Sequence, residues 1–272
     1  MNDGWESDAT RRAKAGLIDV TVPNAARVGD YLHGGRDNFE ADRRAVRALV
    51  ASAPSVAAIP GAARAFRGRV VSYLAGEASV TQFLDIGAGM APPGNTHEVA
   101  QGVDPACRIV YVESDAMVLS HAQALIRSAT GGVVSCVEGD ITDPHAIIAS
   151  ASSFLDFDRP IVVMLMSALA HVASTADAVK VVSSLMAAVP SGSYVAVYHL
   201  ASDLDPALTK ALHHWNAMAP RPMTLRSRTE VLALLDGLEL VPPGVVAVND
   251  WRSDDSGCED AVPVHGAVAR KP

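Results

Sequence analysis

The chain has 272 residues, of which 49% are hydrophobic and 19% are charged, and its formal net charge at pH 7 is −8. This composition fits a folded protein with a sizeable core and excludes a wholly disordered chain. Lysine and arginine form no block, which argues against a nucleic-acid partner. The three cysteines lie far apart without a CxxC pair, which argues against a disulfide framework and against a zinc site.

Targeting signals are not apparent in this sequence. The first residues lack the basic segment and following apolar segment of a secretory signal. The longest apolar stretch, residues 160–170, is too short to cross a bilayer. We therefore expect a cytoplasmic protein without a membrane partner, and the oligomeric state stays open.

Helices are expected along the first part of the chain. Residues 1–20 are polar and are predicted to be a flexible N-terminus. Three helices are predicted next, from Asn24 to Gly34-Gly35, over 38–52 and over 60–74. Residues 21–78 thus form a helical segment. The many polar residues around its Gly-Gly turn would be explained by a lid over a ligand, or by helix ends and caps alone.

From residue 79 onward the pattern changes to alternating strands and helices. Short strands that are apolar at nearly every position are typical of a parallel sheet covered on both faces. The predicted strands are 81–86, 108–113, 133–138, 160–166 and 193–199, and the predicted helices are 95–102, 115–128, 143–150 and 175–188. Such alternation implies a doubly wound sheet with right-handed crossovers.

The C-terminal part is expected to complete this sheet. Ser227 and Glu230 form a capping box that opens a short helix. Two final strands, at 238–241 and 261–269, are predicted to pair antiparallel. The predicted fold is therefore an α/β, Rossmann-like, doubly wound sheet of seven strands over residues 79–272, preceded by the helical segment.

The turn after the first strand, Asp85-Ile-Gly87-Ala-Gly89, is typical of a nucleotide pocket, because glycines let a backbone approach a ligand closely. A full dinucleotide fingerprint needs a third glycine where Pro92 stands. Pro92 and Pro93 also move the next helix start, whose bare amides would bind a pyrophosphate, away from the glycines. Asp85 suits a cation. These features favour S-adenosylmethionine, which carries an ammonium and a sulfonium but no phosphate, over a dinucleotide. An ordinary strand–loop turn without a ligand is the alternative.

Polar residues also follow the next two strands. Glu113 ends the second strand, where it can accept hydrogen bonds from both ribose hydroxyls, and Ser114 lies beside it. Asp115 is expected to cap the following helix. After the third strand, Asp140 can accept a hydrogen bond from the adenine amine and Ile141 can pack on the ring. A capping role is the alternative for Asp140.

The methyl-donor end of the pocket is expected beside the fourth strand, with Met166 and Ser167 as its floor. His171 is the most attractive general base, because an imidazole titrates near neutrality, although a single histidine more often has a structural role. Tyr31 and Asp37 are the other candidates for accepting a proton. No metal site is predicted.

These motifs resemble those of a family of class I S-adenosylmethionine-dependent methyltransferases, long known as a domain of unknown function and common in actinobacteria. The resemblance covers nearly the whole chain. It is carried by residues 23–27, 30–32, 34–35, 37–39, 42–43, 82–87, 95–101, 110–112, 140–144 and 237–241. The most specific part is Gly34-Gly35 with Asp37-Asn38-Phe39.

The resemblance implies a reversed last strand, S-adenosylmethionine as the ligand, and a helical lid that includes Gly34 and Gly35. Arg64 would pair with the donor carboxylate, and Asp85 would serve the same methionine end. The chain departs from the family pattern at Gly29, Arg36, Ala63, Glu113 and Ala170. Glu113 keeps the ribose role, and the changes at Gly29, Ala63 and Ala170 bear on the acceptor more than on the donor.

The predicted function is methyl transfer to an oxygen or nitrogen of a small molecule that the sequence does not identify. The protein's part would be alignment and exclusion of water. Two alternatives stay open. One is a sensor or partner protein that binds S-adenosylmethionine or its demethylated product without transfer. The other is a nicotinamide-dependent oxidoreductase that uses Gly87, Gly89 and Glu113.

Overall fold

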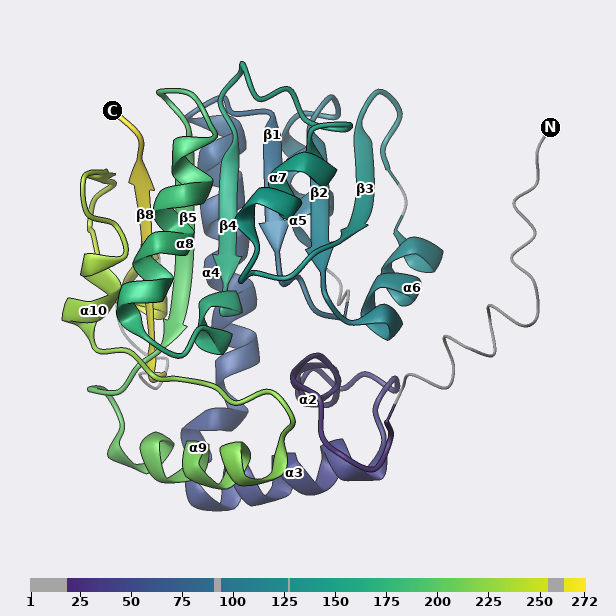
Figure 1. Ribbon diagram of the computed structural model, residues 1–272, viewed down its shortest axis with the longest axis vertical. Coiled ribbons are helices and arrows are strands. Elements are labelled where there is room, and N and C mark those ends of the chain that lie inside the picture. The colour runs from purple at the N-terminus through teal and green to yellow at the C-terminus, as the bar shows by residue number, and fades with distance from the viewer. Residues whose placement is uncertain (1–18, 91–93, 127, 254–261) are drawn as a thin grey trace.

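A central sheet with helices on both faces and a helical cap at one end of the strands make up the protein (Figure 1). The computed structural model describes residues 19–90, 94–126, 128–253 and 262–272. Pro92, Pro93 and most of the predicted flexible N-terminus lie outside these ranges. Within them, no helix is both long enough and apolar enough to cross a membrane.

Five parallel strands form the larger part of the sheet, in the order β3-β2-β1-β4-β5. They are β1 (Gln82–Ile86), β2 (Arg108–Glu113), β3 (Val133–Glu138), β4 (Val162–Met166) and β5 (Tyr194–Leu200). The strand order reverses between β1 and β4, which opens a crevice at the carboxyl ends of these two strands. β8 (Val264–Arg270) pairs antiparallel with β5, so the predicted doubly wound sheet with a reversed last strand is confirmed.

The predicted number of seven strands is wrong, because the edge of the sheet is split. The described residues form eight strands, and β6 (Glu239–Leu240) and β7 (Val246–Ala247) share the edge position beside β8. Pro242 and Pro243 stand between them. Proline has no backbone N–H to give to a strand ladder, so the edge cannot continue as one strand.

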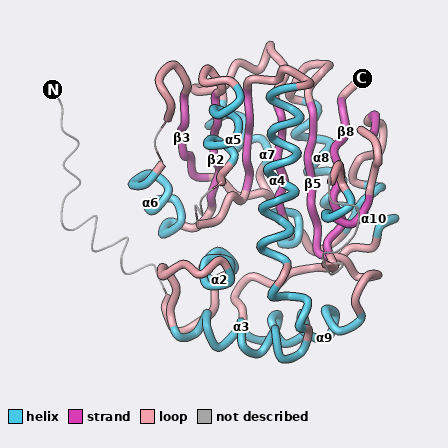
Figure 2. Tube along the Cα trace, turned by 180° about the vertical axis from the view of Figure 1, so that it is seen from behind, coloured by secondary structure: helices cyan, strands magenta, loops and turns pink. Residues whose placement is uncertain are grey.

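Helices cover both faces of the sheet (Figures 1 and 2). One face carries α4 (Ile59–Gly76) and α5 (Thr96–Val103), and the other carries α7 (Pro144–Ala151), α8 (Thr175–Ala187) and α10 (Arg228–Ala233). α6 (Ala116–Leu125) packs beside β2 and β3. Phe66, Val70 and Leu74, spaced by four along α4, are fully buried against the sheet, as one face of an amphipathic helix should be.

The cap consists of α2 (Ala25–Leu32), α3 (Glu40–Ser52), a short 3₁₀ helix (Pro54–Ala57) and α9 (Pro206–Met218). These helices share a small apolar core, in which Leu49 of α3 packs with Leu212 and Trp215 of α9. No helix was predicted at α9, although Asp205 caps it and proline occupies its first turn. α4 begins at the cap and runs along the sheet, so the segment 21–78 contributes to both layers.

Candidate functional site

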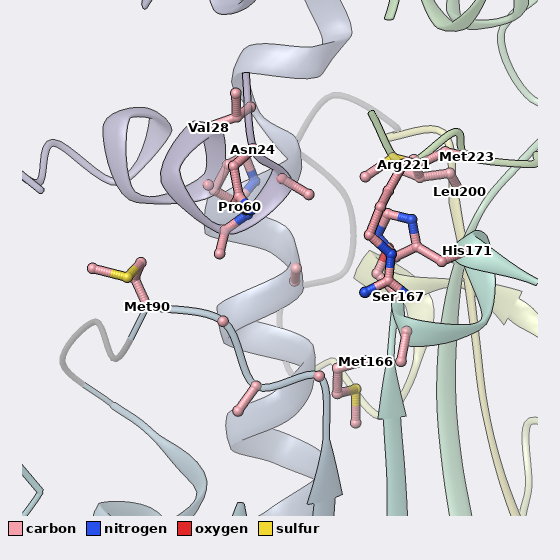
Figure 3. Close-up of a pocket in the computed structure, with 18 of the residues that line it drawn as sticks. Asn24, Val28, Pro60, Met90, Met166, Ser167, His171, Leu200, Arg221 and Met223 are labelled. Carbon is pink, nitrogen blue, oxygen red and sulfur yellow. Dashed lines mark hydrogen bonds between the residues drawn. The ribbon is translucent and has the colours of Figure 1, made fainter. Parts of the chain in front are cut away.

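A cavity of about 530 Å³ lies between the carboxyl ends of the strands and the cap. This volume is within the range of about 300–1,000 Å³ that is usual for small-molecule sites. In Figure 3, Met90 marks the loop after β1, and Met166 and Ser167 form the floor at the end of β4. His171 and Arg221 lie together on one side, opposite α2. The cavity therefore occupies the crevice where the strand order reverses.

The glycine turn after β1 needs its glycines for different reasons. Gly87 and Gly89 have φ angles of +75° and +69°, which L side chains rarely adopt. A Cβ atom on Gly87 would also lie 2.9 Å from the Cβ of Ala168, whereas one on Gly89 would meet nothing within 4 Å. The backbone N–H of Gly89 donates a hydrogen bond to Oε1 of Glu113. The turn thus joins the tips of β1 and β2 at the cavity wall.

Glu113 is a buried carboxylic acid at the tip of β2, with 8% of its surface exposed. Burial, together with the charges of the nearby Asp85 and Asp115, raises the pKa of Glu113 to about 7. Hydrogen bonds from the backbone N–H groups of Gly89 and Ser114 act in the opposite direction. Two hydroxyl donors would satisfy this carboxylate, and adjacent ribose hydroxyls provide that pair.

Asp85 is almost fully buried near the end of β1, with 1% exposure. Its Oδ2 accepts a hydrogen bond of 2.6 Å from Oγ1 of Thr96, while its Oδ1 has no partner within the described part of the chain. Burial raises the pKa of Asp85, and Thr96 and the charge of Arg67 lower it. An unpaired, buried carboxylate oxygen is costly, so this position fits a cationic ligand group such as an ammonium.

The loops after β2 and β3 meet at the predicted adenine end. Ile141 lines the cavity and is 6% exposed. Asp140 does not line the cavity, because its carboxylate binds Thr142 and also lies 3.0 Å from Nη2 of Arg221. Nη1 of Arg221 donates a hydrogen bond of 2.7 Å to Oγ of Ser114, which does line the cavity. Arg221 therefore bridges these two loops, and no sequence signal singled it out.

His171 lines the cavity at the end of the short 3₁₀ helix Ala168–His171. Its Nδ1 lies 3.2 Å from the carbonyl oxygen of Pro222. A carbonyl can only accept, so Nδ1 carries the proton and Nε2 keeps a free lone pair. Burial lowers the pKa of His171, and the charge of Arg221 lowers it further. A neutral imidazole with a free Nε2 can accept a proton from a bound molecule.

The cap is attached to the sheet domain at the mouth of the cavity. Oδ1 of Asn24 caps α2, and its Nδ2 donates a hydrogen bond of 2.8 Å to Oδ2 of Asp115, the residue that caps α6. Oδ1 of Asp42 accepts a hydrogen bond of 2.9 Å from the backbone N–H of Asn24. Nε of Arg27 lies 2.9 Å from Oδ2 of Asp42, and both side chains are buried. This network explains why residues 23–27 and Asp42 form a recognisable motif.

Four further residues of the predicted site lie away from the cavity wall: Gly34, Gly35, Tyr31 and Asp37. A Cβ atom on Gly35 would lie 2.0 Å from Oδ1 of Asp30, so the glycine is needed to form the turn between α2 and α3. Oδ2 of Asp30 also accepts a hydrogen bond of 2.9 Å from the backbone N–H of Asp37. Gly34 and Gly35 therefore build a turn and do not line the cavity, although Asp30 and His33 beside them do.

The two predicted proton acceptors of this cluster have other contacts. Tyr31 packs against the apolar core of the cap. The carboxylate of Asp37 is half-exposed and lies 3.1 Å from Nε2 of His121 on α6. Neither side chain reaches the cavity that His171 lines.

α4 places two arginines on the cavity wall, and only one of them was predicted. Arg64 lines the cavity, and Arg67 lines it one helical turn later. Nε of each is buried without a hydrogen-bond partner. Their spacing of three along a helix places them on one face, a signal that the sequence contained.

Comparisons with known proteins agree with this geometry. The sequence profile of the family described as S-adenosyl methyltransferase matches residues 11–272. The chain belongs to this family. The crystal structure of a DUF574 family protein from Streptomyces avermitilis is 36% identical, covers 93% of this chain and 99% of its own, and has a TM-score of 0.89. A candidate methyltransferase from Thermobifida fusca is 34% identical, covers 93% and 96%, and has a TM-score of 0.86.

More distant structures share the fold of this S-adenosyl methyltransferase. A magnesium protoporphyrin IX methyltransferase from Synechocystis, crystallised with S-adenosylhomocysteine, is 11% identical, covers 90% of this chain and 93% of its own, and has a TM-score of 0.56. Among proteins with curated functions, no sequence matches significantly. Family membership makes the chain an S-adenosylmethionine-dependent methyltransferase and removes the nicotinamide alternative.

Proposed function

We propose that this methyltransferase acts on a hydroxyl or amine of a small molecule bound in the cap half of the cavity. One observation carries the proposal: a single cavity extends from the glycine turn and Glu113 to His171 and the helices of the cap. Glu113 would hold the ribose and Asp85 the ammonium of S-adenosylmethionine. Arg64 would pair with its carboxylate, and Ile141 would pack on its adenine.

The donor, when bound, supplies a methyl carbon on a sulfonium, whose carbon–sulfur bond breaks as the bond to the acceptor forms and whose sulfur keeps the electron pair. The chain's own part is to align the acceptor and to exclude water. We assign the proton that leaves a hydroxyl or ammonium to Nε2 of His171. Of the three residues considered for this role, His171 is the one that lines the cavity, and Tyr31 and Asp37 do not.

A small acceptor is favoured by the enclosure of this site. The cavity lies between the strand tips and the cap, and Asn24 and Arg221 bridge parts of its mouth. The net charge of −8 and the absence of a lysine and arginine block disfavour a nucleic acid. A free amino acid, a phenol or a small amine could enter where a folded macromolecule could not.

Calorimetric titration with S-adenosylmethionine tests the donor site. Glu113→Ala should weaken binding by about 1–3 kcal/mol, the scale of a lost hydrogen bond to a charged group. Methyl transfer to a panel of phenols, amines and hydroxy acids, followed by mass spectrometry, tests the reaction. Binding without product from any acceptor would favour the sensor or partner alternative. If a product forms, His171→Asn should slow methyl transfer and leave the affinity for S-adenosylmethionine unchanged.

A further inference from the structure

Two guanidinium groups on the cavity wall have no hydrogen-bond or ion-pair partner among the described residues. Within the described part of the chain, no hydrogen bond or ion pair joins Arg64 or Arg67 to another residue, and Nε of each is buried. A partly desolvated guanidinium without an anionic partner is costly. Their presence on the wall of a ligand cavity therefore points to anionic groups on the ligands.

The single carboxylate of the methyl donor can neutralise the charge of only one of the two arginines. The donor also brings an ammonium and a sulfonium. Asp85, near the end of β1, fits the ammonium. The carboxylates of Asp30, Glu113 and Asp115 also line the cavity, but among the described residues no ion pair joins any of them to Arg64 or Arg67. An anionic group on the acceptor would give the second guanidinium a direct partner.

The positions of the two arginines distinguish their roles. Cδ of Arg64 lies 3.8 Å from the place of a Cβ atom on Gly94, so this side chain is beside the loop that follows the glycine turn. Arg67 acts electrostatically on Asp85 of β1 and on Tyr198 of β5, whereas both arginines act on His33 of α2. Arg67 thus lies between the strand tips and the cap, where an acceptor would meet the donor.

The cap half of the cavity is mostly apolar, although Asn24, Asp30 and His33 also line it. Its wall is formed by side chains of three helices, namely Val28, Leu32, Leu49, Leu208, Leu212 and Trp215. Such a wall favours a hydrophobic ring or chain over a sugar or a free amino acid.

We propose that the acceptor is an apolar carboxylic acid whose carboxylate pairs with Arg67 and whose ring or chain packs in the cap. The hydroxyl or amine of the same molecule faces His171. This inference rests on the proposed function, because it places the acceptor beside a bound donor. It adds the chemical class of the acceptor and the residue that selects it.

The test uses 2-naphthoate, decanoate and the neutral amide 2-naphthamide as probes. Their binding is measured by calorimetry on protein saturated with S-adenosylhomocysteine, for the wild type, Arg67→Met and Arg67→Lys. Arg44→Met is the matched control, because Arg44 is an exposed arginine of α3. Thermal unfolding of each variant confirms that it is folded. Titration with S-adenosylhomocysteine alone reports the donor site separately.

At least one acid should bind the loaded wild type, and 2-naphthoate should bind roughly 10- to 100-fold more tightly than its amide. Arg67→Met should remove this preference, Arg67→Lys should keep part of it, and Arg44→Met should leave it unchanged. The inference is overturned if neither acid binds the loaded protein, or if acid and amide bind the wild type equally. It is also overturned if Arg67→Met weakens the binding of S-adenosylhomocysteine and leaves the binding of 2-naphthoate unchanged. Failure of S-adenosylhomocysteine to bind the wild type would instead contradict the proposed function.

Discussion

Glu113 is expected to make donor binding depend on pH near neutrality. Burial raises the pKa of this carboxyl to about 7, so the donor-free protein holds it partly protonated at pH 7. The ionised form can accept hydrogen bonds at both oxygens, whereas the neutral form has one oxygen that donates. Ribose hydroxyls should therefore select the ionised form, and donor affinity should fall as the pH falls.

The size of this effect follows from the fraction ionised. With a pKa of about 7, roughly nine in ten of the Glu113 carboxyls are ionised at pH 8 and roughly one in ten at pH 6. The Kd for the donor should then rise about tenfold between pH 8 and pH 6, which corresponds to about 1.4 kcal/mol. At pH 7, binding should release about half a proton.

Calorimetry with S-adenosylhomocysteine between pH 6 and pH 8 measures both quantities, because buffers of different ionisation enthalpy reveal the released proton. Glu113→Gln is the matched control, since the amide has nearly the same shape and cannot ionise. This variant should bind S-adenosylhomocysteine more weakly than the wild type, and its affinity should not change between pH 6 and pH 8. A flat profile in the wild type, or the same slope in Glu113→Gln, would refute the assignment of Glu113 to the ribose.

Three further predictions concern the stability of the fold. Gly87→Ala should lower the free energy of unfolding by about 2–3 kcal/mol, because it adds a close contact with Ala168 to an unfavourable φ angle. Gly89→Ala has only the unfavourable φ angle and should cost about 1 kcal/mol. Equal costs in denaturant unfolding would contradict this reasoning. Arg226 is fully buried and donates hydrogen bonds to the carbonyl oxygens of Leu169 and Val172. Arg226→Met should therefore lower the free energy of unfolding by about 3 kcal/mol. A loss no larger than that of the exposed Arg44→Met would count against this prediction. Burial also lowers the pKa of His199 to about 4, so the folded protein resists protonation of this imidazole. The unfolded chain takes up the proton at about pH 6.5, and the stability that neutral His199 contributes is therefore lost as the pH falls from about 6.5 to 4. Glu113, with its raised pKa, acts in the opposite sense over nearly the same range. The His199 effect, up to about 3 kcal/mol, should therefore be clear in Glu113→Gln, and a stability that does not change with pH in that variant would disprove it.

Local sequence determined much of the fold. Each parallel strand is a short apolar run, because a strand covered on both faces has no solvent side to mark with polar residues. Helix starts were also readable, since a cap is a contact between residues two or three apart: Asn24 caps α2, and Ser227 with Glu230 caps α10. The glycine turn could be placed because the left-handed φ of Gly87 is a local requirement.

The edge strand and the cap depended on contacts over longer distances. Whether residues near Pro242 pair with β8 is decided by hydrogen bonds to a strand more than twenty residues away. α9 is held by α3, which lies more than 150 residues earlier, so its role as a wall of the cavity has no local signal. Pattern alone could identify neither contact.

The candidate site shows the same division. Sequence position placed Asp85 and Glu113 at the ends of strands β1 and β2 and His171 shortly after β4, and in a parallel sheet all strand ends of one kind meet at one edge. Helical spacing places Arg67 on the same face as Arg64, but no such rule says which surface that face will meet. Only the tertiary structure directed Asp37 outward to His121 and brought Arg67 into the cavity, because each depends on which surface packs against its neighbours.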